Sequence, residues 1–528
     1  MSALAQTSGR APASPSAAPP EIRALWVDAF HAGIRSPEEV ARLVADAKRA
    51  HFNMLFVQVR RRGDALYTQS VEPPLDDPAY DPKFDALAHV IQAAKREGIE
   101  VHAWLNAMPI WRDAQPPRDP RHVFNLHGPS KTGEDNWLTA SPQGETKFPV
   151  GYFLDPGHPA AAAYTVEVFV NIVRHYAVDG IHFDYIRYPE TDGLLPRGAA
   201  VGYNPVSLAR FGRATGRTDT PAPDDPQWSA WRRQQVTQLV RRVYLEVKAL
   251  RPGIKVSAAL IPWGKNASNE RDFEDAAPVQ RVFQEWHAWL REGLLDLAVP
   301  MNYARDHDAR VRAWFDGWIE WEKRHKHGRQ LAVGIGAYLN APQNTLAQIQ
   351  RVRRRAGRHH ADGVSFFSYA NLFPATPSSA PAANATGANA GTGATPPAPP
   401  NRAPGRDRMA FFVAGVPAES GGEPNHPGAF HNPAPIPRMD WLDQPSRGWL
   451  AGKVQFDSGD PPDGWVVRLR RRGWFSRTHR TITDGNGFFG FTELKPGRYT
   501  VRLHRAGAHK DIRLAVVAGR VTTVDLEQ

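Results

Sequence analysis

The sequence predicts an α/β protein made of a (β/α)8 barrel, a flexible linker and a small all-β sandwich. Eight short apolar segments alternate with amphipathic helical segments between residues 22 and 369, the pattern of such a barrel. The 528 residues are enough for a barrel of about 250 residues or more plus a second domain. After residue 447, short strands separated by Asp-Gly, Pro-Gly and Ala-Gly turns predict the sandwich.

The predicted barrel strands are short and apolar, as expected of parallel strands buried on both faces. They lie at residues 22–28, 53–60, 98–106, 180–183, 255–261, 295–303, 330–338 and 362–369. The helix at residues 36–50 begins with Ser36 as a cap and Pro37 in its first turn. Further helices are expected at residues 84–97, 160–176 and 228–250. Because the eighth strand leads quickly into the linker, we expect the last barrel helix to be short, displaced or supplied from elsewhere.

Composition divides the chain into five parts. Residues 374–408 consist mainly of Ala, Pro, Ser, Thr, Gly and Asn and cannot bury enough apolar surface to fold, which predicts a flexible linker. Before it we expect a disordered segment at 1–20 and the barrel at 21–373. After it we expect an irregular segment at 409–446, whose aromatic residues could pack back on the barrel, and the sandwich at 447–528.

Several classes of site and location are excluded or favoured by composition. Cysteine is absent, which excludes disulfide bonds, thiolate nucleophiles and cysteine-ligated metals. The 20 histidines show no His-Glu-x-x-His spacing, so we expect no dedicated metal site and no cofactor; a site built from carboxylates alone is the alternative that this spacing leaves open. No apolar run reaches roughly 18 residues, which predicts no transmembrane segment. Residues 3–6 have the Ala-x-Ala form of a signal cleavage site, so we expect an exported protein, periplasmic or extracellular, whose signal peptide is not visible in this numbering.

Asp184 is the first candidate for a catalytic residue. It directly follows the apolar residues 180–183, the fourth predicted strand. In a parallel barrel the carboxyl end of each strand lies on the catalytic face. The alternative is that Asp184 caps a turn or pairs with Arg187.

The carboxyl ends of all eight strands face one side of the barrel, so polar and aromatic residues there are candidates for substrate contact. Flat aromatic rings suit stacking on sugars. A glycine-rich phosphate cradle and a strand-end lysine for a Schiff base are both missing. The candidates are Asp28, Arg60, His102, Trp104, Asn106, Asp155, His182, Arg187, Tyr188, Trp263, Asn302, Tyr303, Tyr338 and Tyr369.

Some of these candidates have a structural alternative. Asp155 precedes Pro156-Gly157 and could shape a turn. Asp28 could hold Arg60 or His102 in place. His102 and His182 could be hydrogen-bonded core histidines.

Cleavage of a glycosidic bond needs two carboxyl groups, one protonated as the acid and one ionised as nucleophile or base. Asp184 is the first of the pair by position. The partners that the sequence offers are Glu190, Glu72, Asp155 and Asp306. Asp306 lies between Arg305 and His307 and could only pair with them.

Several of these segments together resemble one known family. Residues 22–28, 57–60 with 63–67, 101–106, 154–157, 179–189 and 300–303 resemble, in this order, the glycosyl hydrolase-like family 10 barrels of bacteria, over residues 20 to 373. The resemblance implies a TIM-barrel glycosidase, usually exported, that acts on bacterial glycans including peptidoglycan. Two positions depart from the family. Tyr185 stands where many relatives carry a second acidic residue, and Asn302 stands where many have glutamine.

The C-terminal part has its own resemblance and its own charge. Residues 483–491 with 494–499 resemble the carboxypeptidase-regulatory-like sandwich domains, which are usually accessory modules. From Arg447 onward there are 15 Lys and Arg against 8 Asp and Glu, a net charge of +7 out of the chain's +11. Such a module could attach the protein to an anionic polymer of the cell envelope. The alternative is a solvated surface, with like charges spread around the sandwich. Nucleic acid is not expected as the main partner.

These observations together predict a glycoside hydrolase that cleaves O-glycosidic bonds in a bacterial polysaccharide, with peptidoglycan glycan strands as one candidate. Asp184 would act as nucleophile or base and a second carboxyl group as acid. Because Tyr185 replaces the second acid, the alternative is a carbohydrate-binding barrel without catalysis.

Overall fold

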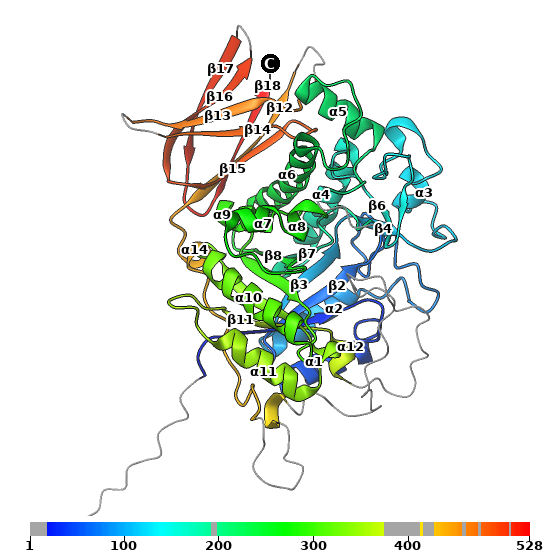
Figure 1. Cartoon of the computed structure of the whole chain (residues 1–528), viewed down its shortest axis with the longest axis vertical. Helices are drawn as coiled ribbons and strands as arrows, with labels where there is room; N and C mark the ends of the chain where they lie inside the picture. Colours follow the sequence, from blue (N-terminus) through cyan, green and yellow to red (C-terminus); the bar gives the residue numbers. More distant parts are fainter. Residues whose placement is uncertain are drawn as a thin grey trace, which may run out of the picture.

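The computed structural model describes residues 18–191, 198–373, 412–415, 427–456, 461–473, 477–505 and 508–527. It confirms the predicted barrel, a closed ring of eight parallel strands in the order β1-β11-β10-β9-β8-β7-β3-β2 (Figure 1). The strands are β1 Ile22–Val27, β2 Met54–Arg60, β3 Glu100–Asn106, β7 Gly180–Asp184, β8 Lys255–Leu260, β9 Leu297–Asn302, β10 Gln330–Gly336 and β11 Gly363–Phe367.

Helices surround the barrel and begin with local caps. Ser36 Oγ accepts a hydrogen bond from the Glu39 amide at the start of α1, with proline as the first helical residue. The last barrel helix has four residues and is short, as expected from the early linker. The longer helices are α1 Pro37–Arg49, α2 Ala86–Arg96, α4 Pro159–His175, α5 Pro205–Thr215, α6 Pro226–Leu250, α10 Ala309–His325 and α11 Pro342–Arg353; the shorter ones are α3 Val123–His127, α7 Glu270–Glu274, α8 Ala277–Gln280, α9 Trp286–Glu292 and α12 Tyr369–Leu372.

Alternation along each strand decides which side chains face the barrel interior. In β9, Leu297, Val299 and Met301 belong to the interior cluster that contains Trp26 and Phe56. The residues between them face the helices. By the same alternation the last inward residues of β3 and β7 are Asn106 and Asp184.

A long excursion follows β3 on the same side as the strand ends. It forms a small antiparallel sheet with the order β4-β6-β5. Its strands are β4 Pro109–Trp111, β5 Lys147–Phe148 and β6 Gly151–Phe153, and it also contains α3. The amide of Leu154 donates to the carbonyl of Met108, which ties the return of the excursion to its start.

The opposite end of the barrel is covered by residues that follow the predicted linker. Phe412 and Phe430 are buried and pack on Phe366 with ring centroids 5.3 and 6.0 Å away. Met439 lies just before the short helix α14 Asp440–Asp443 and packs into the interior cluster from this same end of the barrel. The predicted linker at 374–408 lies outside the described residues, as do residues 1–17.

The C-terminal module is a sandwich of two sheets with their own buried core. One sheet has the order β15-β12-β18 and the other the order β14-β13-β16-β17. The strands are β12 Gly448–Gln455, β13 Val466–Arg471, β14 Thr478–Ile482, β15 Phe488–Leu494, β16 Gly497–Arg505, β17 Ala508–Val516 and β18 Val521–Glu527. Figure 1 shows the sandwich, in orange and red, beside helices α5 and α6.

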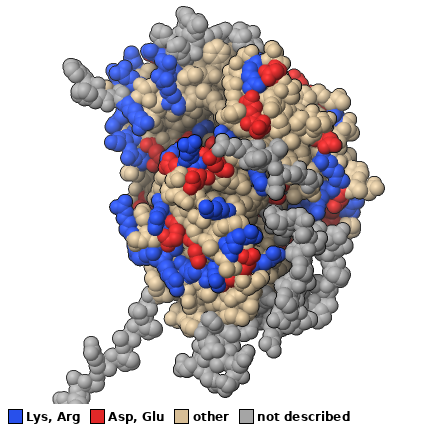
Figure 2. Space-filling view, in the orientation of Figure 1, with Lys and Arg blue, Asp and Glu red and all other residues tan. Residues whose placement is uncertain are grey.

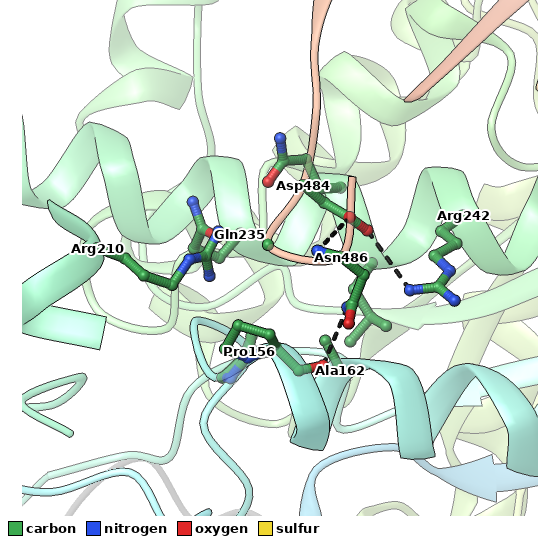
Figure 3. Close-up of a pocket in the computed structure, with 11 residues that line it drawn as sticks. Pro156, Ala162, Arg210, Gln235, Arg242, Asp484 and Asn486 are labelled. Carbon is green, nitrogen blue, oxygen red and sulfur yellow. Dashed lines mark hydrogen bonds and ion pairs between the residues drawn. The ribbon is translucent and has the colours of Figure 1, made fainter. Parts of the chain in front are cut away.

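Polar contacts fasten this sandwich to the barrel. Figure 3 shows the turn after β14, where the Asn486 side chain donates to the Pro159 carbonyl over 3.0 Å and Asp484 lies 3.7 Å from Arg242. Arg210 pairs with Asp463 at 2.7 Å. The cavity lined by Arg210, Arg242 and Asp484 has a volume of about 10 Å³, about the least that holds one water molecule, so this junction is packed and offers no room for a ligand.

Within the described part of the chain, no helix combines the length and the apolar character needed to cross a membrane.

Candidate active site

Asp184 ends β7 at the barrel mouth and is buried there. Its Oδ1 accepts a hydrogen bond from the Tyr185 amide at 2.7 Å and lies 3.4 Å from Arg187 Nη1. Burial raises the pKa of Asp184, and the charge of Arg187 offsets part of that effect. Asp184 therefore has the pairing with Arg187 that the sequence offered as an alternative, together with the raised pKa that acid–base chemistry uses.

The chain turns sharply after Asp184. Tyr185 has φ of 48°, in the left-handed region that residues other than glycine rarely adopt. Arg187 follows, with its guanidinium 4.1 Å from the centroid of the Tyr185 ring and 5.9 Å from that of Trp263. Its Nη2 is buried and has no hydrogen-bond partner among the described residues. This nitrogen is therefore a donor that the described residues leave unsatisfied.

Glu190 is the sequence-predicted partner that the structure brings near this group. Burial raises the pKa of Glu190, while Arg187 and Arg281 lower it in part. Its Oε1 is buried and accepts no hydrogen bond from the residues that the structure describes. Asp184 and Glu190 thus share Arg187 as a charged neighbour, and burial raises the pKa of both.

Aromatic rings line the strand ends around Asp184. The Tyr303 ring lies 6.2 Å from Tyr338 and 5.7 Å from Phe367, and Trp104 lies 6.4 Å from Phe367. Burial raises the pKa of Tyr303 well above its ordinary value, and the charge of Asp184 adds to this rise. The predicted aromatic candidates Trp104, Tyr303 and Tyr338 therefore form one group beside the carboxylate.

Amides fix the neighbouring positions of the mouth. Asn106 Oδ1 accepts hydrogen bonds from Trp104 Nε1 and from Gln58 Nε2, both at 3.1 Å, and its Nδ2 donates to the Arg61 carbonyl. Gln58 was not among the predicted site residues. Its signal in the sequence is a lone amide within the apolar strand β2, on the same face as Phe56.

Asp28 directly follows β1 and holds neither Arg60 nor His102. It accepts from Ser368 Oγ at 3.0 Å and lies 2.6 Å from His31 Nδ1. Burial opposes ionisation of Asp28, but the bonds from His31 and Ser368 outweigh it and lower its pKa. His31, whose side chain is 41% exposed, is a further site residue that the sequence interpretation missed.

Two carboxylates offered as catalytic partners have structural roles. Glu72 is fully buried in a two-pronged ion pair with Arg60, and it also accepts from Tyr164 at 2.6 Å. Asp306 pairs with Arg351, instead of with the neighbours that the sequence suggested. Each of these carboxylates is paired with an arginine, and neither is kept as a candidate. Arg60 is likewise held by Glu72.

His102 and His182 are core residues inside the barrel. Both rings place Nδ1 2.9 Å from Ser257 Oγ, and His182 Nε2 accepts from Trp26 at 3.0 Å. Both histidines have no exposed surface. The hydrogen-bonded core alternative therefore describes them, and sugar contact does not.

Asn302 faces away from the mouth, because it is an outward residue of β9. Its Nδ2 donates to both carboxylate oxygens of Glu322 on α10, at 2.9 and 3.0 Å. Burial raises the pKa of Glu322 well above its ordinary value. The placement of Asn302 in the substrate site was wrong.

Asp155, Tyr188 and Tyr369 also lie away from the mouth surface. Asp155 shapes its turn by accepting from the Gly157 amide at 2.7 Å, and it receives Tyr188 OH at 3.3 Å. Burial raises the pKa of Asp155 to about 6. Tyr369 OH donates to Asp46 on α1. These contacts build the frame under the site.

A larger cavity, of about 480 Å³, lies at the opposite end of the barrel. It is lined by Glu21, Arg23, Arg353 and the start of β11, among others. Glu21 pairs with both arginines. This is the face that stabilises barrels of this kind, so the site at Asp184 is preferred on chemistry. Among the described residues, no three His, Asp or Glu side chains gather closely enough to hold a metal ion.

Comparison with known proteins gives relatives for both parts of the chain. Residues 450–527 match the carboxypeptidase regulatory-like domain. The barrel is 24% identical over 326 residues to glycosyl hydrolase DigH of Escherichia coli strain K12, which covers 55% of this chain and 66% of DigH. It is 24% identical over 350 residues to glycosyl hydrolase YngK of Bacillus subtilis strain 168, which covers 61% of this chain and 62% of YngK. The chain thus spans slightly less than two thirds of each.

Among solved structures, the glycoside hydrolase domain of PgaB (BpsB) from Bordetella bronchiseptica aligns with a TM-score of 0.47 and 18% identity, over 66% of this chain and 94% of that domain. The catalytic domain of a β-amylase from Paenibacillus polymyxa aligns with a TM-score of 0.48 and 11% identity, over 67% and 94%. The family model that matches the barrel, glycosyl hydrolase-like 10, covers residues 21–344. By this match the chain belongs to the glycosyl hydrolase-like 10 family.

Proposed function

We propose that this protein is a glycoside hydrolase that cleaves O-glycosidic bonds in a bacterial polysaccharide, with peptidoglycan glycan strands as the first substrate to test. One observation carries the proposal. Two carboxyl groups whose pKa values are raised by burial, Asp184 and Glu190, share one arginine beside a group of aromatic rings.

Glu190 fits the acid of the reaction. An acid must keep its proton near neutral pH and have a free oxygen to donate it. Burial favours the protonated form of Glu190, and its buried Oε1 accepts no bond within the described chain. The proton passes to the glycosidic oxygen as the bond from that oxygen to the anomeric carbon breaks.

Asp184 fits the nucleophile or base. Its pairing with Arg187 supports the ionised form against the effect of burial. As a base it removes a proton from water, which then bonds to the anomeric carbon; as a nucleophile it bonds to that carbon first and water releases the sugar. Arg187 would steady the negative charge, and Trp104, Tyr303 and Trp263 would stack on sugar rings.

The test uses the full-length protein with Asp184→Asn and Glu190→Gln, and the release of reducing ends from purified peptidoglycan and other bacterial glycans is measured. We expect each variant to lose about 10²-fold or more of the rate. Asp113→Asn serves as the control, because Asp113 is an exposed carboxylate in the excursion after β3. Hydrolysis by Asp184→Asn at the wild-type rate would remove Asp184 from the mechanism.

The non-catalytic alternative has a separate result. If the wild type binds one of these glycans and releases no reducing ends from any of them, the barrel is a carbohydrate-binding module. A substrate in the cell envelope also requires export, so we infer a periplasmic or extracellular location. Fractionation of cells that express the complete gene tests this, and recovery only with the cytoplasm would contradict it.

A further inference from the structure

Six of the 15 Lys and Arg residues of the C-terminal module lie on one face of one sheet. In β13 and β16 the inward residues, including Val467, Leu469 and Val501, are buried in the sandwich core. The residues between them face out. Six arginines occupy such outward positions of the sheet β14-β13-β16-β17: Arg468, Arg470, Arg480, Arg498, Arg502 and Arg513.

The strand register places some of these arginines directly opposite one another. Arg468 on β13 is opposite Arg480 on β14 and opposite Arg502 on β16. Arg502 is in turn opposite Asp511 on β17, with which it forms an ion pair at 2.6 Å. Asp511 is the one acidic residue in the sequence of the four strands. Like charges directly opposite on neighbouring strands destabilise a sheet, so this row is unfavourable for folding alone.

The face that carries the six arginines points away from the barrel. Helix α6 contacts β15, β12 and β18, so the sheet β15-β12-β18 lies between the barrel and the other sheet. Gly490 of β15 approaches Leu245 of α6, and Trp449 of β12 lies beside Tyr244. The arginine face is therefore the outer surface of the far sheet. Figure 2 shows Lys and Arg gathered in that region, at the upper left of the view.

The sequence left open a uniformly solvated surface, with like charges spread around the sandwich. The register instead collects six arginines on one face, in rows that cross neighbouring strands about 4.8 Å apart. Guanidinium groups at such a spacing can bind successive carboxylates of a polymer through paired hydrogen bonds.

We propose that this arginine face binds an anionic polysaccharide and so holds the barrel beside its polymer. The described outward positions of the four strands hold Arg, Thr, Val, Ile, Ala and Asp. None of these described positions holds an aromatic ring of the kind on which proteins stack nucleic-acid bases, or a Trp, Phe or Leu of the kind that inserts into membranes. Carboxylate-bearing sugar chains need neither.

Binding of the full-length protein to polygalacturonate immobilised on a sensor surface tests the proposal. The variant is Arg468→Gln/Arg480→Gln/Arg502→Gln. The matched control is Arg310→Gln/Arg312→Gln/Arg324→Gln, which removes the same charge from exposed positions of α10. Neutral dextran and double-stranded DNA are the comparison ligands.

We expect the wild type and the α10 control to bind polygalacturonate, and the sheet variant to bind it on the order of tenfold more weakly. The slope of log affinity against log salt should also fall by about 2 for the sheet variant. Circular dichroism and urea unfolding verify that the sheet variant is folded. We expect it to fold, because the substitutions remove repulsion between arginines on neighbouring strands. Arg470→Gln/Arg498→Gln/Arg513→Gln, on the same face, should weaken binding as well.

Three results would overturn the proposal: equal binding by the sheet and α10 variants, equal binding of dextran and polygalacturonate, or tighter binding of DNA than of polygalacturonate at the same salt. The assay reads binding without turnover. Its failure is therefore distinguishable from failure of the hydrolase proposal, which the Asp184 variant tests.

Discussion

Replacing Glu72 by glutamine separates a structural role of this carboxylate from a catalytic one. Glu72 and Arg60 are buried to 0% and 1% side-chain exposure, and Arg60 Nη2 and Nε lie 2.8 Å from the carboxylate oxygens. Burial disfavours the charged guanidinium, yet Glu72 outweighs this and raises the pKa of Arg60. Glu72→Gln would leave that positive charge buried without its counter-charge.

Removing one partner of a buried ion pair costs about 3–5 kcal/mol. We therefore expect Glu72→Gln to lower the free energy of unfolding by about 3 kcal/mol or more, measured by urea unfolding with tryptophan fluorescence. Tyr164→Phe removes only the hydrogen bond to Glu72 and should cost about 1 kcal/mol. Hydrolysis per folded molecule should fall far less in Glu72→Gln than in Asp184→Asn. Unchanged stability with lost hydrolysis would refute the structural assignment.

Three further variants test the site and its frame. In Arg187→Gln we expect both limbs of the pH profile of kcat/KM to move to higher pH, because Arg187 lowers the pKa of Asp184 and of Glu190. Arg187→Lys keeps the positive charge and should keep the wild-type limbs. Unmoved limbs in Arg187→Gln would contradict the assignment. Burial raises the pKa of Asp155 to about 6 in the folded state, so the folded state binds the extra proton, and we expect wild-type stability to fall by roughly 2 kcal/mol as pH rises from 4 to 7. Urea unfolding of Asp155→Asn should show a smaller fall over the same range, and an unchanged fall would contradict this assignment. Asn302→Ala should lower the free energy of unfolding in urea by roughly 1–3 kcal/mol, because it leaves the buried Glu322 carboxylate without these two hydrogen bonds. Lost hydrolysis at unchanged stability would instead place Asn302 in the substrate site.

The barrel could be predicted from the sequence because parallel strands and their helices carry strong local patterns. Apolar strands of five to seven residues, such as β7 and β10, stand out from the amphipathic helices between them. Proline after a capping residue marks the start of α1. These signals depend on neighbours in sequence, and the fold class followed from them.

The composition of the site was harder to predict because it depends on which face of a strand a residue occupies. Asp184 and Asn302 each end a strand, but Asp184 is an inward residue and Asn302 an outward one. The phase of alternation is ambiguous in a strand buried on both sides, since inward and outward residues are equally apolar. Ion pairs such as that of Arg60 with Glu72, 12 residues apart across a loop, leave no local pattern either.

The arginine face shows the opposite case, in which the strands alternate in polarity and the phase is clear. Leu469 and Val501 are buried while Arg468 and Arg502 face out, so the alternation of β13 and β16 can be followed in the sequence. The sequence cannot give the register that sets Arg468 opposite Arg480. It is this register that places Arg468, Arg480 and Arg502 side by side on three neighbouring strands.

The sandwich is held to the barrel by its own contacts, and this bears on how the arginine face could act. Arg210 pairs with Asp463, Arg329 pairs with Glu493 at 2.7 Å, and Trp449 packs beside Tyr244 of α6. These contacts come from three separate parts of the barrel and fix the orientation of the sandwich. A polymer bound on the outer sheet would therefore stay at a constant distance from the strand ends. Its effective concentration at the barrel would rise without any folding back of the sandwich over the mouth.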